Sequence, residues 1–130
     1  MKSPDEPQGS TPSPLGPQWE MNISEERRGD VRVVSVSGAT DYHTAPRLGA
    51  YLAQRFADPE VRHVVLEMSG VEFCDSSGIG ALVMAYKQSR SADATFRVAR
   101  VHPNVRRILE LAQLTSILPI YPTVEAALTP

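Results

Sequence analysis

Two different spacings of hydrophobic residues alternate along most of the chain. Short runs that are apolar at every second position, or nearly throughout, are typical of β-strands. These runs cover residues 19–26, 31–38, 62–69, 94–101 and 116–122. Between them lie runs with an apolar residue every three to four positions, as in amphipathic helices. These runs cover residues 44–57, 77–89, 105–112 and 123–128. Strands that alternate with helices predict an α/β fold.

The connections between strands predict how the strands pair. Residues 27–30, with Gly29 at the bend, are a tight turn that joins the first two strands as an antiparallel hairpin. The later strands are separated by helices, which favours parallel pairing. Residues 62–69 are almost continuously apolar, which is typical of a strand covered on both faces. We therefore predict a mixed, mostly parallel sheet with an N-terminal antiparallel strand pair and about four helices packed against it.

Three helices have apolar faces that can be assigned from the sequence. The face expected at residues 44–57 comprises Ala45, Leu48, Leu52 and Phe56, and that at residues 77–89 comprises Ile79, Leu82, Val83 and Tyr86. A third face comprises Val105, Ile108, Leu109 and Ala112. Thr44 is expected to be the N-cap of the first helix, and Pro46 is tolerated in its first turn, which has no donor to lose.

The first eighteen residues differ from the rest of the chain. They are rich in Pro, Ser, Gly and Gln and contain few side chains to bury. Such a segment cannot offset the entropy cost of ordering, so we predict a disordered tail at residues 1–18. The chain of 130 residues is long enough for one domain of ordinary size, which we place at residues 19–130, beginning near Trp19.

Composition and charge exclude several classes of function. The net charge of −2 gives no field that would recruit nucleic acid or an anionic membrane. Cys74 is the only cysteine, which excludes an intramolecular disulfide and fits a reducing compartment. No apolar run approaches the roughly 20 residues that a membrane helix needs. We expect a cytoplasmic globular protein with no direct nucleic-acid or membrane partner.

Most catalytic motifs are missing. The sequence has no phosphate-binding loop and no G-x-S-x-G motif, and the G-x-G around Ile79 lacks the third glycine of a dinucleotide fingerprint. The three histidines are far apart and have no cysteine at metal-ligand spacing. We therefore predict no metal, no cofactor and no enzymatic activity. A serine-dependent enzyme stays open as an alternative, and it would need His43 within hydrogen-bond reach of Ser76 or Ser77.

The segment EFCDSSGIGALVMAYK, residues 72–87, contains the most informative polar cluster. Asp75, Ser76 and Ser77 are all favoured N-cap residues, and capping alone would explain one of them. Gly78, early in a helix, costs up to about 1 kcal/mol relative to Ala, so we expect something to approach the backbone closely there. Asp41, in the loop after the second strand, could close a turn. The residues alone leave both structural and chemical roles open.

This segment resembles the phosphorylation site of bacterial anti-sigma factor antagonists, which are single STAS domains. In that family an apolar strand ends in D-S-S-G or D-S-T-G and a helix follows, as in VEFCDSSGIGALVMAYK. VVSVSGATDYHTA is similar to the family's strand and loop that usually read G-E-L-D, and VHPNVRRILELAQLTSILPIYPTVEAAL resembles its closing helix, strand and helix. The resemblance covers about residues 20–129.

The resemblance implies a partner-switching regulator. The unmodified protein would bind an anti-sigma factor that is also a serine kinase, and would thereby free a sigma factor. The kinase would phosphorylate Ser76 and end the association, and a separate serine phosphatase would reset the cycle. Asp41 matches the family's aspartate beside the phosphorylation site, which helps to contact the kinase. Ala39 and Thr40 depart from the usual G-E-L-D pattern.

The expected partner surface surrounds this site. It comprises Asp41, Asp75, Ser77, Gly78, Ala81 and Met84, with Ala85 beside them. Small residues allow a partner to approach closely and Met84 offers an adaptable apolar contact, although the same residues could pack against the next helix instead. An alternative within the same fold is a STAS scaffold or transporter-accessory protein in which Ser76 is not modified.

Overall fold

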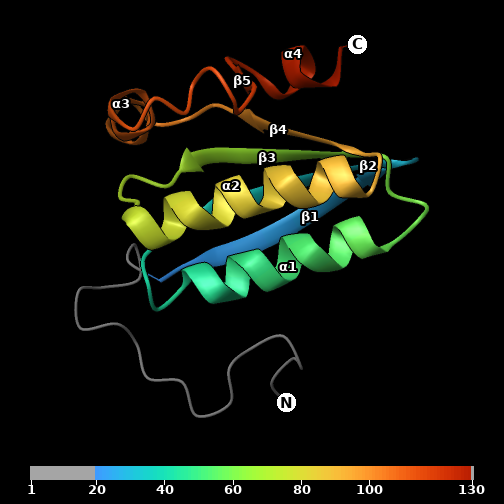
Figure 1. Ribbon diagram of the computed structural model, residues 1–130, viewed down its shortest axis with the longest axis horizontal. Coiled ribbons are helices and arrows are strands. Elements are labelled where there is room, and N and C mark those ends of the chain that lie inside the picture. The colour runs from blue at the N-terminus through green and yellow to red at the C-terminus, as the bar shows by residue number, and fades with distance from the viewer. Residues whose placement is uncertain (1–19, 130) are drawn as a thin grey trace.

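The computed structural model describes residues 20–129, so the predicted tail and the domain start at Trp19 lie outside the described residues. One five-stranded sheet has its strands in the order β1-β2-β3-β4-β5. The strands are β1 (Asn22–Arg28), β2 (Val31–Ser37), β3 (His63–Gly70), β4 (Thr95–Ala99) and β5 (Ile120–Tyr121). Only β1 and β2 pair antiparallel, and the other neighbours are parallel (Figure 1). The predicted mixed sheet with a leading antiparallel pair is confirmed.

The turn between β1 and β2 is tighter than the sequence predicted. β1 continues to Arg28, which pairs with Val31, so only Gly29 and Asp30 form the turn. Gly29 has a φ of 61°, a conformation in which other residues are strained. The predicted position of Gly29 at the bend is therefore confirmed.

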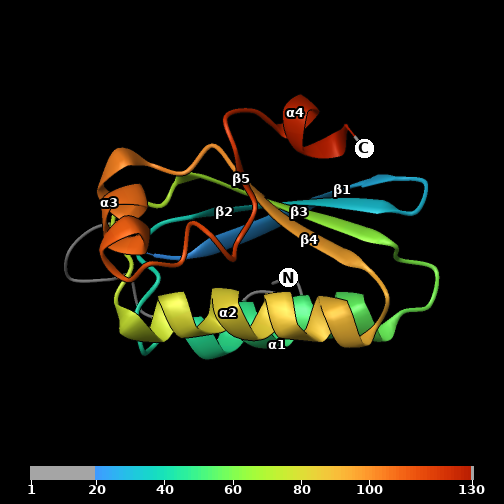
Figure 2. The ribbon, with the colours of Figure 1, turned by 45° about the horizontal axis from the view of Figure 1, so that its top comes forward.

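Helices cover the two faces of the sheet unequally. The four helices of the described chain are α1 (Ala45–Ala57), α2 (Ser76–Ser91), α3 (Pro103–Leu111) and α4 (Val124–Leu128). Figure 2 shows α1 and α2 side by side below the sheet, the short α4 above it and α3 at one end. This arrangement confirms the predicted α/β architecture and leaves the start of α2 at an accessible edge.

The main core lies between the sheet and the pair α1 and α2. Its fully buried residues include Leu48, Leu52, Leu66, Leu82 and Phe96. A second, smaller cluster of Val65, Ala99 and Ala127 lies under α4 on the opposite face. Strand β3 is thus buried on both sides in its middle, as predicted, because α1 and α2 cover one face and α4 covers the other.

The predicted helix faces are partly correct. The buried residues of α1 are the predicted Ala45, Leu48, Leu52 and Phe56. In α2 the buried residues extend to Ala85 and Ser89, whereas Val83 and Tyr86, predicted to be central, are only half-buried. The Ser89 hydroxyl donates to the Tyr86 carbonyl, 2.6 Å away, which satisfies it inside the core.

The N-cap position of the first helix is confirmed, although its side chain acts differently than expected, and the predicted face of the third helix extends one residue too far. Thr44 occupies the N-cap position of α1, but its side chain makes no capping hydrogen bond. Its hydroxyl instead accepts from the Asp41 N–H at 2.9 Å and donates to the Ala39 carbonyl at 3.0 Å, so it holds the preceding loop. Ala112, predicted on the face of the third helix, is exposed because α3 ends at Leu111.

Candidate functional site

Two loops that follow neighbouring parallel strands form the frame of the site. The Thr40 N–H donates to the Phe73 carbonyl at 3.0 Å, and the Asp75 N–H donates to the Thr40 carbonyl at 3.2 Å. These bonds form an isolated parallel bridge between Thr40 and Cys74, which extends the pairing of β2 and β3 beyond the strand ends. The loops that carry Asp41 and Asp75 therefore meet, because the carboxyl ends of adjacent parallel strands lie at one edge of the sheet.

Asp75 is the N-cap of α2. One of its carboxylate oxygens accepts from the backbone N–H groups of Ser77 and Gly78, at 2.8 and 3.1 Å. The other accepts from the Tyr42 N–H in the neighbouring loop, at 3.2 Å. A single carboxylate thus satisfies helix donors and fastens the two loops together.

Because Asp75 caps α2, the Ser76 hydroxyl is not needed as a cap. Ser76 is the first residue of α2 and is exposed, and no hydrogen bond of its side chain is found among the described residues. Ser77 is half-buried and borders a groove between α1 and α2. Of the two serines, Ser76 therefore presents the more accessible hydroxyl.

Gly78 is the point of close approach that the sequence predicted. It is buried, and a Cβ atom there would lie 2.7 Å from the Thr40 carbonyl oxygen and would also collide with the Cys74 sulfur. The neighbours of Gly78 therefore belong to its own chain. Gly78 allows α2 to begin close against the two loops. Because it is buried, it does not belong to the exposed surface predicted to contact a partner. Ala85 is also buried and leaves that surface for the same reason.

Cys74 lies beneath the start of α2 and is buried. Burial, reinforced by the nearby Asp75 carboxylate, raises the pKa of the Cys74 thiol to about 12. The thiolate is the reactive form of cysteine, so this thiol is inert near neutral pH. Cys74 is therefore a small residue of the hydrophobic core.

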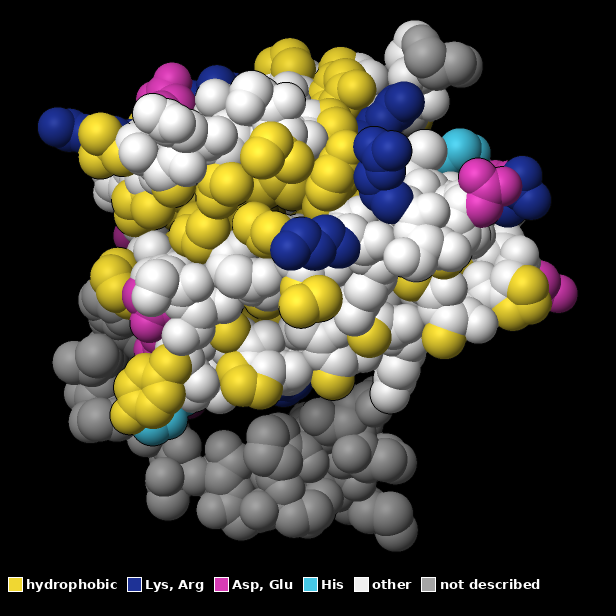
Figure 3. Space-filling model, in the orientation of Figure 1, with side chains coloured by type: hydrophobic (Ala, Val, Ile, Leu, Met, Phe, Trp, Pro, Cys, Tyr) yellow, Lys and Arg dark blue, Asp and Glu magenta, His cyan; other side chains and the backbone are white. Residues whose placement is uncertain are grey.

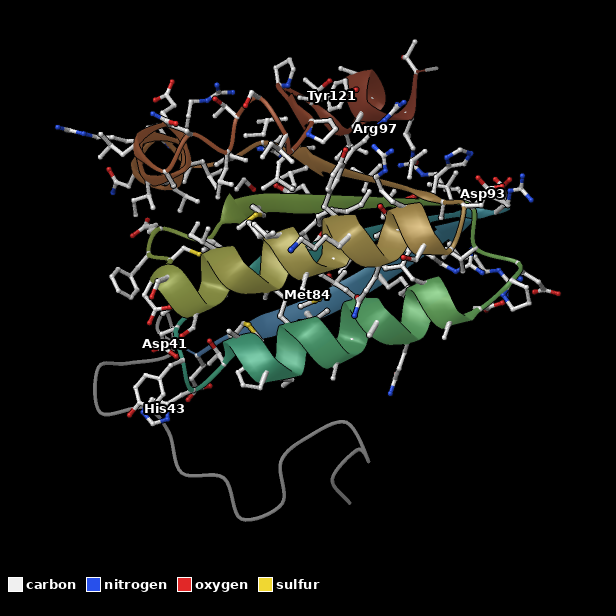
Figure 4. All side chains as sticks on the ribbon, viewed as in Figure 1. Asp41, His43, Met84, Asp93, Arg97 and Tyr121 are labelled. Carbon is white, nitrogen blue, oxygen red and sulfur yellow. The ribbon has the colours of Figure 1, made fainter. Side chains whose placement is uncertain are left out.

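Asp41 closes the turn before α1, as one of its two predicted roles required. A carboxylate oxygen of Asp41 accepts from the N–H groups of His43 and Thr44, at 2.9 and 3.1 Å. The turn presents the exposed Tyr42 ring, which stacks on His43 with ring centroids 4.0 Å apart. Figure 4 shows Asp41 and His43 in this loop, at the end of the molecule where α2 begins.

The serine-dependent enzyme gains no support from this geometry. No interaction among residues 20–129 joins His43 to Ser76 or Ser77, and the His43 ring is engaged with Tyr42. The same part of the chain contains no group of three or more His, Cys, Asp or Glu side chains that could hold a metal ion. No helix within it is both long and apolar enough to cross a membrane.

Large apolar side chains are exposed on the two loops and on α2. Tyr42, Phe73 and Met84 are large hydrophobic residues that are 65%, 44% and 54% exposed. Beside Ser77, a groove of about 480 Å³ runs between α1 and α2. Its floor and walls are mostly small side chains: Ala45, Gly49, Ala50, Ala53 and Ala81, with Met84 beside them. Figure 3 shows separate apolar side chains along this face.

The chain belongs to the STAS domain family, whose model matches residues 22–127. Its relatives include the anti-sigma F factor antagonist of Paenibacillus polymyxa, which is 31% identical over 109 residues, spanning 84% of this chain and 93% of the relative.

Solved structures agree with this assignment. An anti-sigma factor antagonist from Mycobacterium paratuberculosis superimposes with a TM-score of 0.77 at 32% identity, covering 91% of this chain and 96% of that chain. The phosphorylated form of the Bacillus cell fate determinant SpoIIAA has a TM-score of 0.64 at 17% identity, covering 80% and 94%, and shows a shared fold. The resemblance seen in the sequence is confirmed.

Proposed function

We propose that this protein is an anti-sigma factor antagonist switched by phosphorylation of Ser76. In the unphosphorylated form it binds an anti-sigma factor that is also a serine kinase, and so frees a sigma factor. The observation that carries the proposal is an exposed Ser76 at the first position of α2, with no structural hydrogen bond of its own. The names of the relatives support the antagonist part of this function.

The charge around Ser76 explains how phosphorylation would end binding. A phosphate adds about −1.5 to −2 charges at pH 7. The N–H groups of Ser77 and Gly78 already bind the Asp75 carboxylate, so the phosphate would lie next to a negative charge rather than replace one. A partner surface shaped for a neutral hydroxyl would then face two like charges that it must desolvate.

The fold should tolerate the modification. The hydroxyl of Ser76 supports no contact, and the positive end of the α2 dipole partly offsets the added charge. We therefore expect phosphorylation to act at the interface and to leave the core unchanged. SpoIIAA, which shares the fold, exists in a phosphorylated form.

The docking surface would combine the two loops with the exposed side of α2. Asp41 holds the turn that presents Tyr42, while Ser77, Ala81 and Met84 border the groove between α1 and α2. A helix or loop of the kinase could enter this groove because its walls are short side chains. The kinase would supply ATP and magnesium, a separate serine phosphatase would remove the phosphate, and this protein would perform no catalysis.

Phosphorylation can be tested directly with matched variants. The protein is incubated with an anti-sigma factor serine kinase from the same organism, ATP and magnesium, and the modified residue is mapped by mass spectrometry. We expect phosphate on Ser76 in the wild type and in Ser77→Ala, and none in Ser76→Ala. Phosphate on another residue, or none in cells during growth or stress, would overturn the switch and favour an unmodified scaffold.

The docking surface has its own test. Ala81→Arg places a long cation at the mouth of the groove and should weaken kinase binding by more than about tenfold, which is roughly 1.4 kcal/mol. Ala112→Arg makes the same change at an exposed position after α3 and serves as the control. If Ala81→Arg folds normally and binds the kinase with full affinity, the groove is not the interface.

A further inference from the structure

Half of strand β4 has no neighbour along one side. β5 pairs with β4 only at Val98 and Ala99, through Ile120 and Tyr121. Residues 95–97 therefore form an open sheet edge in the described part of the chain. This edge lies near the last turns of α2, and 14 residues of helix, about 21 Å, separate Arg90 from Ser76.

The backbone of Phe96 faces this unpaired edge at the bottom of a groove, and because Phe96 is only 2% exposed, an added strand must displace the side chains that cover it. The N–H of Thr95 donates toward β3, to the Arg62 carbonyl, whereas the N–H of Val98 donates toward β5, to the Pro119 carbonyl, both at 2.9 Å. Successive residues of a strand direct their N–H groups to alternate sides, so those of Phe96 and Val98 point the same way. No backbone hydrogen bond within residues 20–129 joins Phe96 to the chain before β5.

Pro119 explains why the pairing stops there. The next rung of the parallel ladder would need residue 119 to donate its N–H to the Phe96 carbonyl. Proline has no N–H, so this rung cannot form. An unpaired edge with a free N–H and a free C=O is a template on which an extended segment can add as a new strand.

Two arginines flank the edge. A groove of about 420 Å³ there is lined by Tyr86, Arg90, Asp93, Arg97 and Tyr121, among others. The Arg90 guanidinium donates to the Tyr86 hydroxyl at 3.2 Å, and that of Arg97 donates to two backbone carbonyls at 2.8 Å. These partners are neutral, and neither arginine has a carboxylate within 4.0 Å among the described residues. Figure 3 shows basic side chains at this end of α2, and Figure 4 labels Asp93, Arg97 and Tyr121.

We propose that an extended segment of a protein partner, with two adjacent acidic side chains, adds to residues 95–97 as an extra strand. Neighbouring side chains of a strand point to opposite faces of the sheet. Arg90 belongs to α2, on one face, and Arg97 bonds to the end of α4, on the other, so adjacent acidic residues would reach one arginine each. A second copy of the chain fits poorly, because the edge lies in a groove and the same basic pair would face itself.

A peptide titration tests the proposal. The probe is Ac-TVEEVT-NH2 added to the 15N-labelled full chain, and the charge control is Ac-TVKKVT-NH2. We expect the amide signals of residues 95–97 to shift, the Phe96 amide to exchange more slowly with solvent hydrogen, and the lysine peptide to bind at least about tenfold more weakly. N-methylation of both glutamates should weaken binding strongly, because it removes the one glutamate N–H that faces β4.

Variants separate this site from the phosphorylation switch. Arg90→Glu should reverse the preference between the two peptides, whereas Arg106→Glu, at an exposed position on α3, should not. Ser76→Asp should lose kinase binding but bind the acidic peptide as tightly as the wild type does. The strand-addition proposal and the phosphorylation proposal can therefore fail independently.

Three results would overturn this proposal. The first is an absence of shifts at residues 95–97, and the second is equal binding of the two peptides. The third is a Phe96 amide already protected in the free chain. Protection that depends on protein concentration would mean that a second copy occupies the edge. Protection that is independent of protein concentration would mean that another segment of the same chain occupies the edge.

Discussion

Thr40 offers a sharp test of the packing beneath the site. Its side chain is fully buried, and the hydroxyl oxygen has no hydrogen-bond partner among the described residues. The backbone of Thr40, by contrast, is paired with both Phe73 and Asp75. Thr40→Val keeps the shape and the backbone bonds and replaces the hydroxyl by a methyl group.

The magnitude follows from the cost of burying an unpaired hydroxyl, which is about 1–3 kcal/mol in proteins. We expect Thr40→Val to raise the free energy of unfolding by about 1–2 kcal/mol. For a domain of this size the melting temperature should rise by about 4 °C per kcal/mol. Urea denaturation at constant pH, followed by circular dichroism, measures the change.

Thr44→Val is the matched control, because it makes the same chemical change four residues away. The Thr44 hydroxyl accepts from the Asp41 N–H and donates to the Ala39 carbonyl. Its loss should therefore lower the free energy of unfolding by about 1–3 kcal/mol. If Thr40→Val destabilises the protein as much as Thr44→Val does, the Thr40 hydroxyl is satisfied and the reasoning is refuted.

Three further predictions concern the start of α2. Gly78→Ala should lower the free energy of unfolding by more than about 2 kcal/mol in urea denaturation, because its Cβ would collide with the loop, whereas Gly80→Ala, with open space around it, should raise it by up to about 1 kcal/mol. Asp75→Ala should lower the free energy of unfolding by about 1–2 kcal/mol, and Ser76→Ala should lower it by less than about 0.5 kcal/mol, both measured by urea denaturation. Equal losses in the two variants would contradict capping by Asp75. Cys74 should resist a thiol reagent at pH 8 until the protein unfolds. Because burial on folding raises the pKa of the Cys74 thiol from 9.0 to about 12, the stability that this shift contributes is present below pH 9. It is lost as pH rises toward 12, and Cys74→Ala should lack this loss.

Periodicity was sufficient to predict the elements of this fold but not the rotation of every helix. The sequence places Ile79 and Leu82 on the core face of α2 correctly, because large apolar residues at helical spacing leave little choice. It misses Ser89, which is polar by composition yet buried, since its hydroxyl bonds to the helix backbone. Small residues such as Ala85 carry too weak a signal to fix which way they face.

Contacts between loops were harder to predict than elements. The sequence offers Asp75, Ser76 and Ser77 as equivalent caps, and Thr44 as the cap of the first helix. The choice among them depends on the bridge between Thr40 and Cys74, which joins segments more than thirty residues apart. Only that pairing brings the Tyr42 N–H to the Asp75 carboxylate, and so makes Asp75 the cap that also joins the loops.

The division of tasks between Asp75 and Ser76 links the fold to the proposed switch. In a serine that capped the helix, phosphorylation would move the cap from the hydroxyl to the phosphate oxygens and so rearrange the helix start. Here the carboxylate of Asp75 performs the capping, and the adjacent hydroxyl stays free. Phosphorylation can therefore change the charge of the surface while the helix start and the two loops keep their hydrogen bonds. In the proposed switch, each cycle would then change the surface without rearranging the hydrogen bonds that hold the helix start.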